Sequence, residues 1–146
     1  MCNRKSGWLL AIAAVGALAC GGDQSGPSVA SLVGTWRATK AEVVSAANPS
    51  TKVDLVAMGG TVRLVLTDAK TFTLTSTMPG AADDVTTGTW TSSIDMLRLA
   101  YGYGSWECDM TLTGNSLSLG GADTDYDFNG DDVDEPAKWY LTLVRE

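Results

Sequence analysis

The sequence predicts an all-β protein, in which eight strands form one antiparallel up-and-down barrel behind a signal peptide and a flexible tether. Three observations support this prediction. With 146 residues, the chain suits one domain with a single hydrophobic core. After Gly34, apolar residues mostly alternate with polar ones, which is the pattern of half-buried strands. Turn-forming residues separate these runs at short intervals, as in a meander of neighbouring strands.

The strand pattern recurs in eight segments along the chain. The first runs over 35–45 and ends before Pro49, because proline cannot donate to a strand ladder. Residues 53–58 fit either a helical turn or a loop. The other strands are expected at 61–67, 71–78, 85–92, 96–103, 106–112, around Leu117 and Leu119, and from Trp139 to Leu143. An up-and-down barrel is the simplest arrangement of these strands, and a two-sheet sandwich is the alternative.

The side chains expected to face the interior are bulky. They are Trp36, Phe72, Leu74, Met78, Trp90, Leu97, Leu99, Tyr101, Tyr103, Trp106, Met110, Trp139 and Leu141. An eight-stranded barrel is just wide enough to be filled by such side chains or to hold one small ligand. Tyr101 and Tyr103 lie near a strand end and are candidates for a polar-tipped ligand site, together with Trp90 and Trp106. Alternatively, the tyrosines complete a packed core and keep their hydroxyl groups in water.

The amino terminus has the features of a secretory signal peptide. Arg4 and Lys5 precede an apolar run over 8–18, and small residues follow it. The run is shorter than the roughly 20 apolar residues that span a bilayer. Small and polar residues after Cys20 indicate a tether. The expected boundaries are 1–19 for the signal peptide, 20–30 for the tether and 31–146 for the barrel.

The segment Ala-Leu-Ala-Cys at 17–20 resembles the lipobox of bacterial lipoproteins, with Ala17 where leucine is usual. The resemblance implies that Cys20 is lipidated, becomes the new amino terminus and anchors the protein to a membrane of the bacterial cell envelope, on the periplasmic or outer-membrane side. An ordinary signal peptide with a chance cysteine is the alternative. Without Cys2 and Cys20, only Cys108 remains, so no intramolecular disulfide is expected. Cys108 alternates with polar residues and fits a buried small hydrophobe rather than a nucleophile.

The barrel also carries a family resemblance. Gly34-Thr35-Trp36 matches the Gly-x-Trp signature at the start of the first lipocalin strand. Lipocalins place an arginine near the end of the last strand, packed across this tryptophan, and Arg145 is the matching residue. The mature chain therefore resembles a bacterial lipocalin-like lipoprotein. The resemblance implies a barrel closed by Gly34, Trp36 and Arg145 that binds a small apolar ligand, although 53–58 is shorter than the long first loop of typical lipocalins.

One acidic stretch has the spacing of a metal site. Asp125, Asp127 and Asn129 precede Gly130, as in the opening of an EF-hand calcium loop. The twelfth position is Pro136 instead of a bidentate glutamate, and no helices are expected beside the loop. The candidate calcium ligands are Asp125, Asp127, Asn129, Asp131 and Glu135. A solvated acidic loop that binds no ion is the alternative.

Charge and composition narrow the class of function. The net charge is −7, and seven of the 17 acidic residues lie between Asp123 and Glu135. This balance argues against nucleic acid as a partner. The chain has no histidine, which removes the commonest general base, so we expect no enzyme activity. The sequence predicts a monomeric, lipid-anchored barrel that binds a small apolar molecule. The alternative is a non-enzymatic structural or interaction module with a filled, calcium-stabilised barrel.

Overall fold

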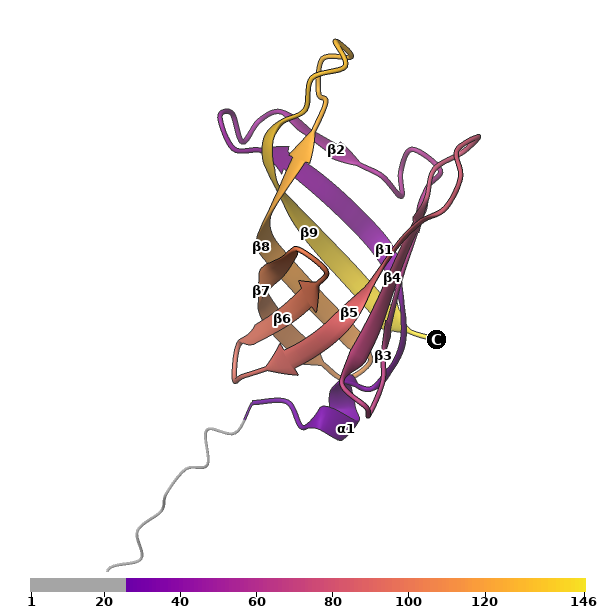
Figure 1. Cartoon of the computed structure of the whole chain (residues 1–146), viewed down its shortest axis with the longest axis vertical. Helices are drawn as coiled ribbons and strands as arrows, with labels where there is room; N and C mark the ends of the chain where they lie inside the picture. Colours follow the sequence, from indigo (N-terminus) through magenta and orange to yellow (C-terminus); the bar gives the residue numbers. More distant parts are fainter. Residues whose placement is uncertain (1–25) are drawn as a thin grey trace, which may run out of the picture.

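The computed structural model describes residues 26–146 and is almost entirely β-structure (Figure 1). The elements are α1 (Val29–Leu32), β1 (Gly34–Ser45), β2 (Lys52–Asp54), β3 (Thr61–Leu66), β4 (Thr71–Thr77), β5 (Asp84–Ser92), β6 (Met96–Tyr101), β7 (Gly104–Thr113), β8 (Ser116–Tyr126) and β9 (Glu135–Arg145). Helix α1 includes the last two residues of the expected tether. Within the described residues, no helix has the length and apolar character that crossing a membrane requires.

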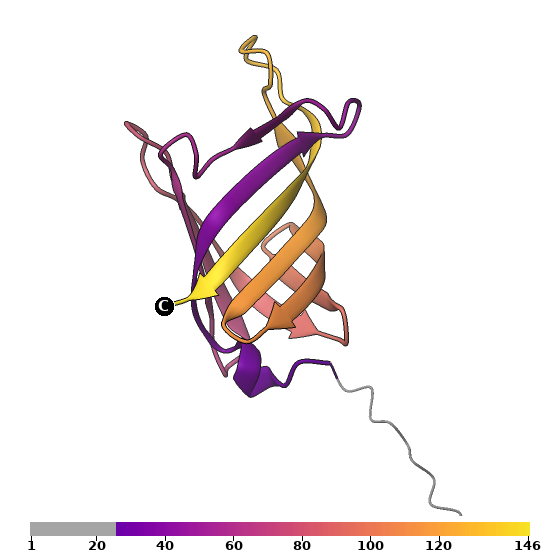
Figure 2. The same ribbon diagram turned by 180° about the vertical axis from the view of Figure 1, so that it is seen from behind.

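Eight of the strands form a closed antiparallel barrel, which confirms the predicted fold and excludes the sandwich. The strands pair in the order β1-β3-β4-β5-β6-β7-β8-β9, and β9 pairs back onto β1. The closing ladder runs from Trp36 opposite Arg145 to Ser45 opposite Ala137. The short strand β2 is additional and pairs with the end of β1 that β3 does not reach. Figures 1 and 2 show β1 and β9 side by side in both views.

The barrel wall is lower on one side than on the others. The β6–β7 hairpin turns at Gly102 and Tyr103, part-way up the barrel (Figure 1). In β5, residues 84–87 pair with β4 but not with β6. In β8, the residues after Gly120 pair with β9 but not with β7. A β-bulge interrupts the register of β8 just after Gly120, where β8 leaves β7. One end of the barrel is therefore open between the extended ends of β5 and β8.

The opposite end is closed by α1 and two side chains. The indole of Trp36 is fully buried and donates a hydrogen bond to the carbonyl oxygen of Leu32 at 2.9 Å. The guanidinium of Arg145 lies 4.3 Å from the centre of the Trp36 ring. It also donates to the carbonyl oxygens of Val33, at 2.7 Å, and Ser31. Arg145 thus ties the end of the last strand to α1 and to the first strand.

Gly34 allows this closure because of its backbone and its missing side chain. Its φ is +146°, a conformation that residues with a side chain rarely adopt. A Cβ atom at this position would collide with the guanidinium of Arg145. The Gly-x-Trp sequence therefore has a steric reason in this chain, since the glycine leaves room for the arginine beside the tryptophan.

All eight barrel strands and α1 contribute to one hydrophobic cluster. Of the side chains predicted to face the interior, most are buried in it. Tyr103 is an exception and corrects the prediction: it is 97% exposed, because the strand expected at 96–103 ends at Tyr101 and a two-residue turn follows. Alternation alone does not reveal a turn that keeps the spacing of two.

We expect the Arg145→Met variant to lower the free energy of unfolding by about 2 kcal/mol, because it removes a guanidinium above an indole and two hydrogen bonds to carbonyl groups. Arg63→Met is the matched control. Arg63 is exposed on β3, and its one ion pair within residues 26–146 is with the carboxylate of Glu146, at 2.8 Å. Its loss should cost about 0.5 kcal/mol or less. Urea denaturation of both variants measures the difference, and equal losses would contradict the closing role of Arg145.

Candidate functional site

A cavity of about 320 Å³ lies inside the barrel at the end away from α1. Its apolar wall includes Leu55, Leu74, Tyr101, Trp106, Trp139 and Leu141. The volume falls at the lower end of the range for small-molecule sites, which is roughly 300–1,000 Å³. The barrel is therefore filled by its core in the closed half and hollow in the open half.

Four aromatic rings follow one another along the cavity wall. The ring centres of Tyr103 and Tyr101 are 5.5 Å apart, and Tyr101 and Trp106 are 4.5 Å apart. Trp106 in turn lies 5.9 Å from Trp139, with the ring planes at 87°. The series runs from the exposed Tyr103 to Trp139, which is 8% exposed. The cavity thus combines a large aromatic surface with hydroxyl groups at its outer end.

Three of the four side chains predicted to contact a ligand line this cavity. They are Tyr101, Tyr103 and Trp106. Trp90 does not line it, which corrects the prediction. Trp90 is 1% exposed in the closed half, where its indole donates to the carbonyl oxygen of Thr67 at 3.1 Å and Lys70 lies 3.9 Å from the ring centre. The alternation of apolar and polar residues predicts that Trp90 faces the interior, but it does not predict where along the barrel axis Trp90 lies.

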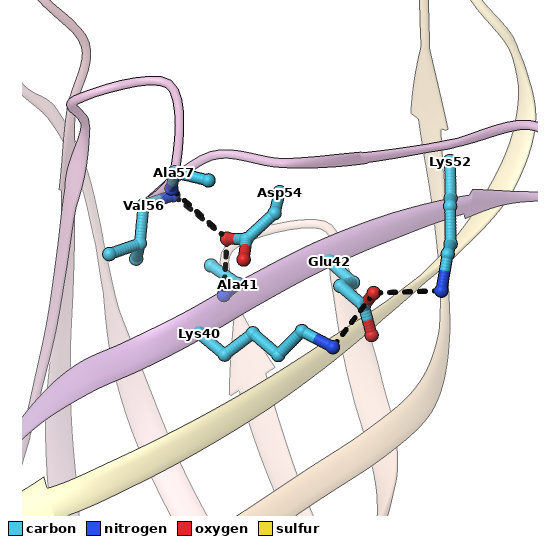
Figure 3. Close-up of polar contacts among 7 residues, drawn as sticks. All are labelled: Lys40, Ala41, Glu42, Lys52, Asp54, Val56 and Ala57. Carbon is cyan, nitrogen blue, oxygen red and sulfur yellow. Dashed lines mark hydrogen bonds and ion pairs between the residues drawn. The ribbon is translucent and has the colours of Figure 1, made fainter.

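The segment after β2 lies at the open end and is held there by Asp54. Its carboxylate accepts hydrogen bonds from the backbone N–H groups of Ala41, Val56 and Ala57 at 3.1, 3.0 and 3.4 Å (Figure 3). The N–H of Leu55 donates to the carbonyl oxygen of Ala41 at 2.8 Å. These bonds hold Leu55 at the cavity wall. The sequence left 53–58 open between a helical turn and a loop, and the structure shows the end of a short strand followed by a turn.

Asp54 is a residue that sequence analysis missed, although an aspartate before a turn is a known sign of such side-chain bonds. Partial burial favours its neutral form, but the three backbone N–H groups outweigh this and lower the pKa of the carboxyl below 3.8. Nearby, Glu42 forms ion pairs with Lys40 and Lys52, both at 3.0 Å (Figure 3). The hydrogen bonds from Lys40 and then Lys52 lower the pKa of Glu42.

The acidic stretch forms the loop between β8 and β9. Carboxylate oxygens of Asp127, Asp131 and Glu135 lie within 4.8 Å of one another. The amide nitrogen of Asn129 donates to Glu135 at 2.8 Å, which places Asn129 beside them. Asp125 does not belong to this group, which corrects the prediction: its carboxylate is not among the converging oxygens, and it pairs opposite Pro136 in the β8–β9 ladder.

When the loop is numbered as an EF-hand loop, Asp127 rather than Asp125 takes the first position. Its carboxylate accepts hydrogen bonds from four backbone N–H groups, those of residues 129–132. Partial burial opposes ionisation, but these donors prevail and lower the pKa of Asp127. Asn129, Asp131 and Glu135 then take the third, fifth and ninth positions, which supply ligands in EF-hand loops. Asp132, in the sixth position, has the positive φ of +63° that the turn there needs.

Cys20 and Cys108 differ in what the structure describes. Cys20, the predicted lipidation site, lies outside the described residues. Cys108 is fully buried, and burial, with a smaller contribution from Asp109, raises the pKa of its thiol to about 12. A thiol with this pKa stays protonated at neutral pH and is a poor nucleophile.

Comparison with protein-family models and with curated proteins finds no match to this chain.

We expect Asp54→Ala to lower the free energy of unfolding by about 1–2 kcal/mol near neutral pH, because three backbone N–H groups lose a charged acceptor. Since the pKa of Asp54 is lowered on folding, its contribution is complete above the unfolded value of 3.8 and declines as the pH falls below it. The deficit of the variant relative to the native chain should therefore shrink at about pH 3.

Asp68→Ala is the matched control for Asp54→Ala, since Asp68 is exposed in the β3–β4 turn at the closed end. Urea denaturation near neutral pH and at about pH 3 tests both variants. A deficit of Asp54→Ala that stays constant over this range would contradict the assigned role of the carboxylate.

Proposed function

We propose that the protein is a lipid-anchored, lipocalin-like protein of the bacterial cell envelope that binds one small apolar molecule at the open end of its barrel. The cavity of about 320 Å³ carries this proposal. Leu74, Tyr101 and Trp106 point into the barrel yet stay only partly buried. A ligand that covers them gains roughly 25 cal/mol for each Å² of apolar surface removed from water.

The cavity favours ligand binding over the alternative of a filled structural barrel. A filled barrel would bury inward-facing apolar side chains along the whole axis, as happens around Trp36 and Trp90. The chain also offers little for catalysis, because it has no histidine and Cys108 carries a protonated, buried thiol. We therefore propose a monomeric binding module without enzyme activity.

The lipid anchor rests on the leader and on the cysteine at position 20. The described chain begins at residue 26 beside α1, at the closed end of the barrel (Figures 1 and 2). A lipid on Cys20 would therefore hold the closed end toward the membrane and turn the cavity away from it. In this orientation the ligand exchanges with the aqueous phase or with another protein, and not directly with the bilayer.

Filling the cavity tests the proposed binding function. Thr86 lines the cavity, whereas its neighbour Thr87 is exposed on the outer face of β5. We expect Thr86→Trp to weaken binding of the apolar fluorophore N-phenylnaphthylamine by about tenfold or more, because the indole occupies the ligand volume. Thr87→Trp should bind it as the native chain does. Thermal denaturation checks that both variants fold, and unchanged binding by folded Thr86→Trp would overturn the proposal.

A second proposal concerns the β8–β9 loop, which we propose binds calcium as a structural site. The convergence of Asp127, Asp131 and Glu135 favours it, since a cation would relieve the repulsion among their charges. Asn129 would supply a further oxygen after a rotation of its amide. Such a site would tie the ends of β8 and β9 together beyond their last pair, Tyr126 and Glu135.

We expect millimolar calcium to raise the melting temperature of the native chain relative to EDTA, by several degrees if the concentration is about 100 times Kd. Asp131→Asn should lose this shift, because it removes one of the converging charges. Asp125→Asn is the matched control and should keep it, since Asp125 lies outside the group. An absent shift in the native chain, or an equal loss in both variants, would overturn the calcium proposal.

A further inference from the structure

We propose that the apolar ligand carries a positively charged amine or quaternary ammonium group, bound by the aromatic series and by Asp84. This inference rests on the proposed function, since it specifies the chemistry of the molecule that the cavity binds. Two independent features of the cavity support it: the arrangement of its rings and the sign of its uncompensated charge.

The four rings line one cavity and are inclined to one another. Tyr101 and Trp106 are 4.5 Å apart with their planes inclined at 43°, and Trp106 meets Trp139 at 87°. Tyr103 stands at 88° to Tyr101 at the outer end. A cation is attracted to the face of a tryptophan or tyrosine ring within about 6 Å of its centre. Tyrosine and tryptophan rings along the cavity wall therefore give a cationic group an aromatic surface to bind, which a purely apolar ligand does not require.

Asp84 supplies the charge. It begins β5 and shares the inward face with Thr86 and Trp90, so that it lies at the cavity wall near the opening. Within residues 26–146 it forms no ion pair. Its neighbour Asp83 differs, because it accepts a hydrogen bond from Thr77 at 2.6 Å. Asp84 is thus a carboxylate at the cavity without a positive partner.

The remaining charges around the cavity do not offset Asp84. No lysine or arginine of the described chain lines it. Glu42 also reaches the wall, where Lys40 and Lys52 both contact its Oε1 at 3.0 Å. Together with the ionised carboxylate of Asp54, which interacts with Lys40, these four charges sum to zero. These two lysines are therefore engaged by Glu42 (Figure 3). The carboxylate that a ligand meets uncompensated is that of Asp84.

The ligand classes can be ranked from this arrangement. An anion, such as a fatty acid, would bring a second negative charge beside Asp84 with no cation to receive it. A neutral ligand would gain no electrostatic attraction from Asp84, whose exposed carboxylate keeps its water. A ligand with an apolar body and a cationic head satisfies the ring faces and the carboxylate together.

Three compounds of similar size and different charge test the inference. Benzyltrimethylammonium is the cation, neopentylbenzene is its uncharged carbon analogue, and phenylmethanesulfonate is the anion. Ligand-observed NMR and tryptophan fluorescence give the dissociation constant of each. We expect the cation to bind about tenfold more tightly than the neutral analogue, and the anion more weakly than both. The preference for the cation should decrease as salt is raised, because Asp84 is near the opening.

Two variants test whether Asp84 causes the preference for the cation over the neutral compound. Asp84→Asn should reduce the ratio between cation and neutral compound to about threefold or less, the part that the rings supply, and leave neutral binding unchanged. Asp68→Asn removes the same charge at the closed end and should keep the native ratio. Because the readout is a ratio of affinities in one protein, a change in stability alone does not alter it.

The outcomes separate this inference from the proposed function. If neopentylbenzene binds in the cavity as tightly as the cation, or the anion binds best, the inference is overturned and the apolar binding function stands. If Asp84→Asn keeps the native ratio, the assignment to Asp84 is overturned. If none of the three compounds binds at millimolar concentration and Thr86→Trp leaves fluorophore binding unchanged, both the inference and the proposed function are overturned.

Discussion

The ladder between β1 and β9 is the constraint on which the rest of the structure depends. It joins the first and last barrel strands, and it is secured where Arg145 lies over Trp36 and binds the carbonyl groups before β1. Without this ladder the eight strands would be an open sheet with two free edges. A closed barrel has an inside, so the inward residues of every strand share one core. The steric need for Gly34 follows from the same contact, because the arginine occupies the space of its side chain.

The two ends of the barrel differ in how completely side chains fill them. Around Trp36 and Trp90 the large side chains fill the interior, and α1 covers it. Toward the other end, β5 and β8 extend past the short β6–β7 hairpin. The strands there no longer surround the axis completely, so the inward side chains are packed less densely. The same set of bulky residues thus produces a solid core in one half and an aromatic cavity in the other.

The carboxylates near the cavity have different partners, and this difference gives the site its charge. Asp54 is satisfied by backbone N–H groups and holds the segment that carries Leu55. Glu42 is paired with two lysines, and the second negative charge that balances them is that of Asp54. Asp84 has no such partner in the described chain and lies at the cavity wall. In the β8–β9 loop, by contrast, Asp127 accepts four backbone bonds, so its charge shapes the loop before any ion is considered.

The sequence by itself determined the strands, because the period of two and the turn residues are local properties that one chain segment carries. It favoured a barrel, but the pairing of β9 with β1 is what excluded the sandwich. It also placed Tyr101 and Trp106 on the inward face. Only the tertiary structure decided depth and partners: that Trp90 lies in the closed half, that Tyr103 stands in a turn, and that the acidic loop starts from Asp127 and not Asp125. Asp54 and Asp84 belong to the same class. The role of Asp84 depends on the strands that form the cavity with β5, and that of Asp54 depends partly on Ala41 in β1. Alternation along one strand contains no information about these contacts, although the bonds from Val56 and Ala57 to Asp54 are local.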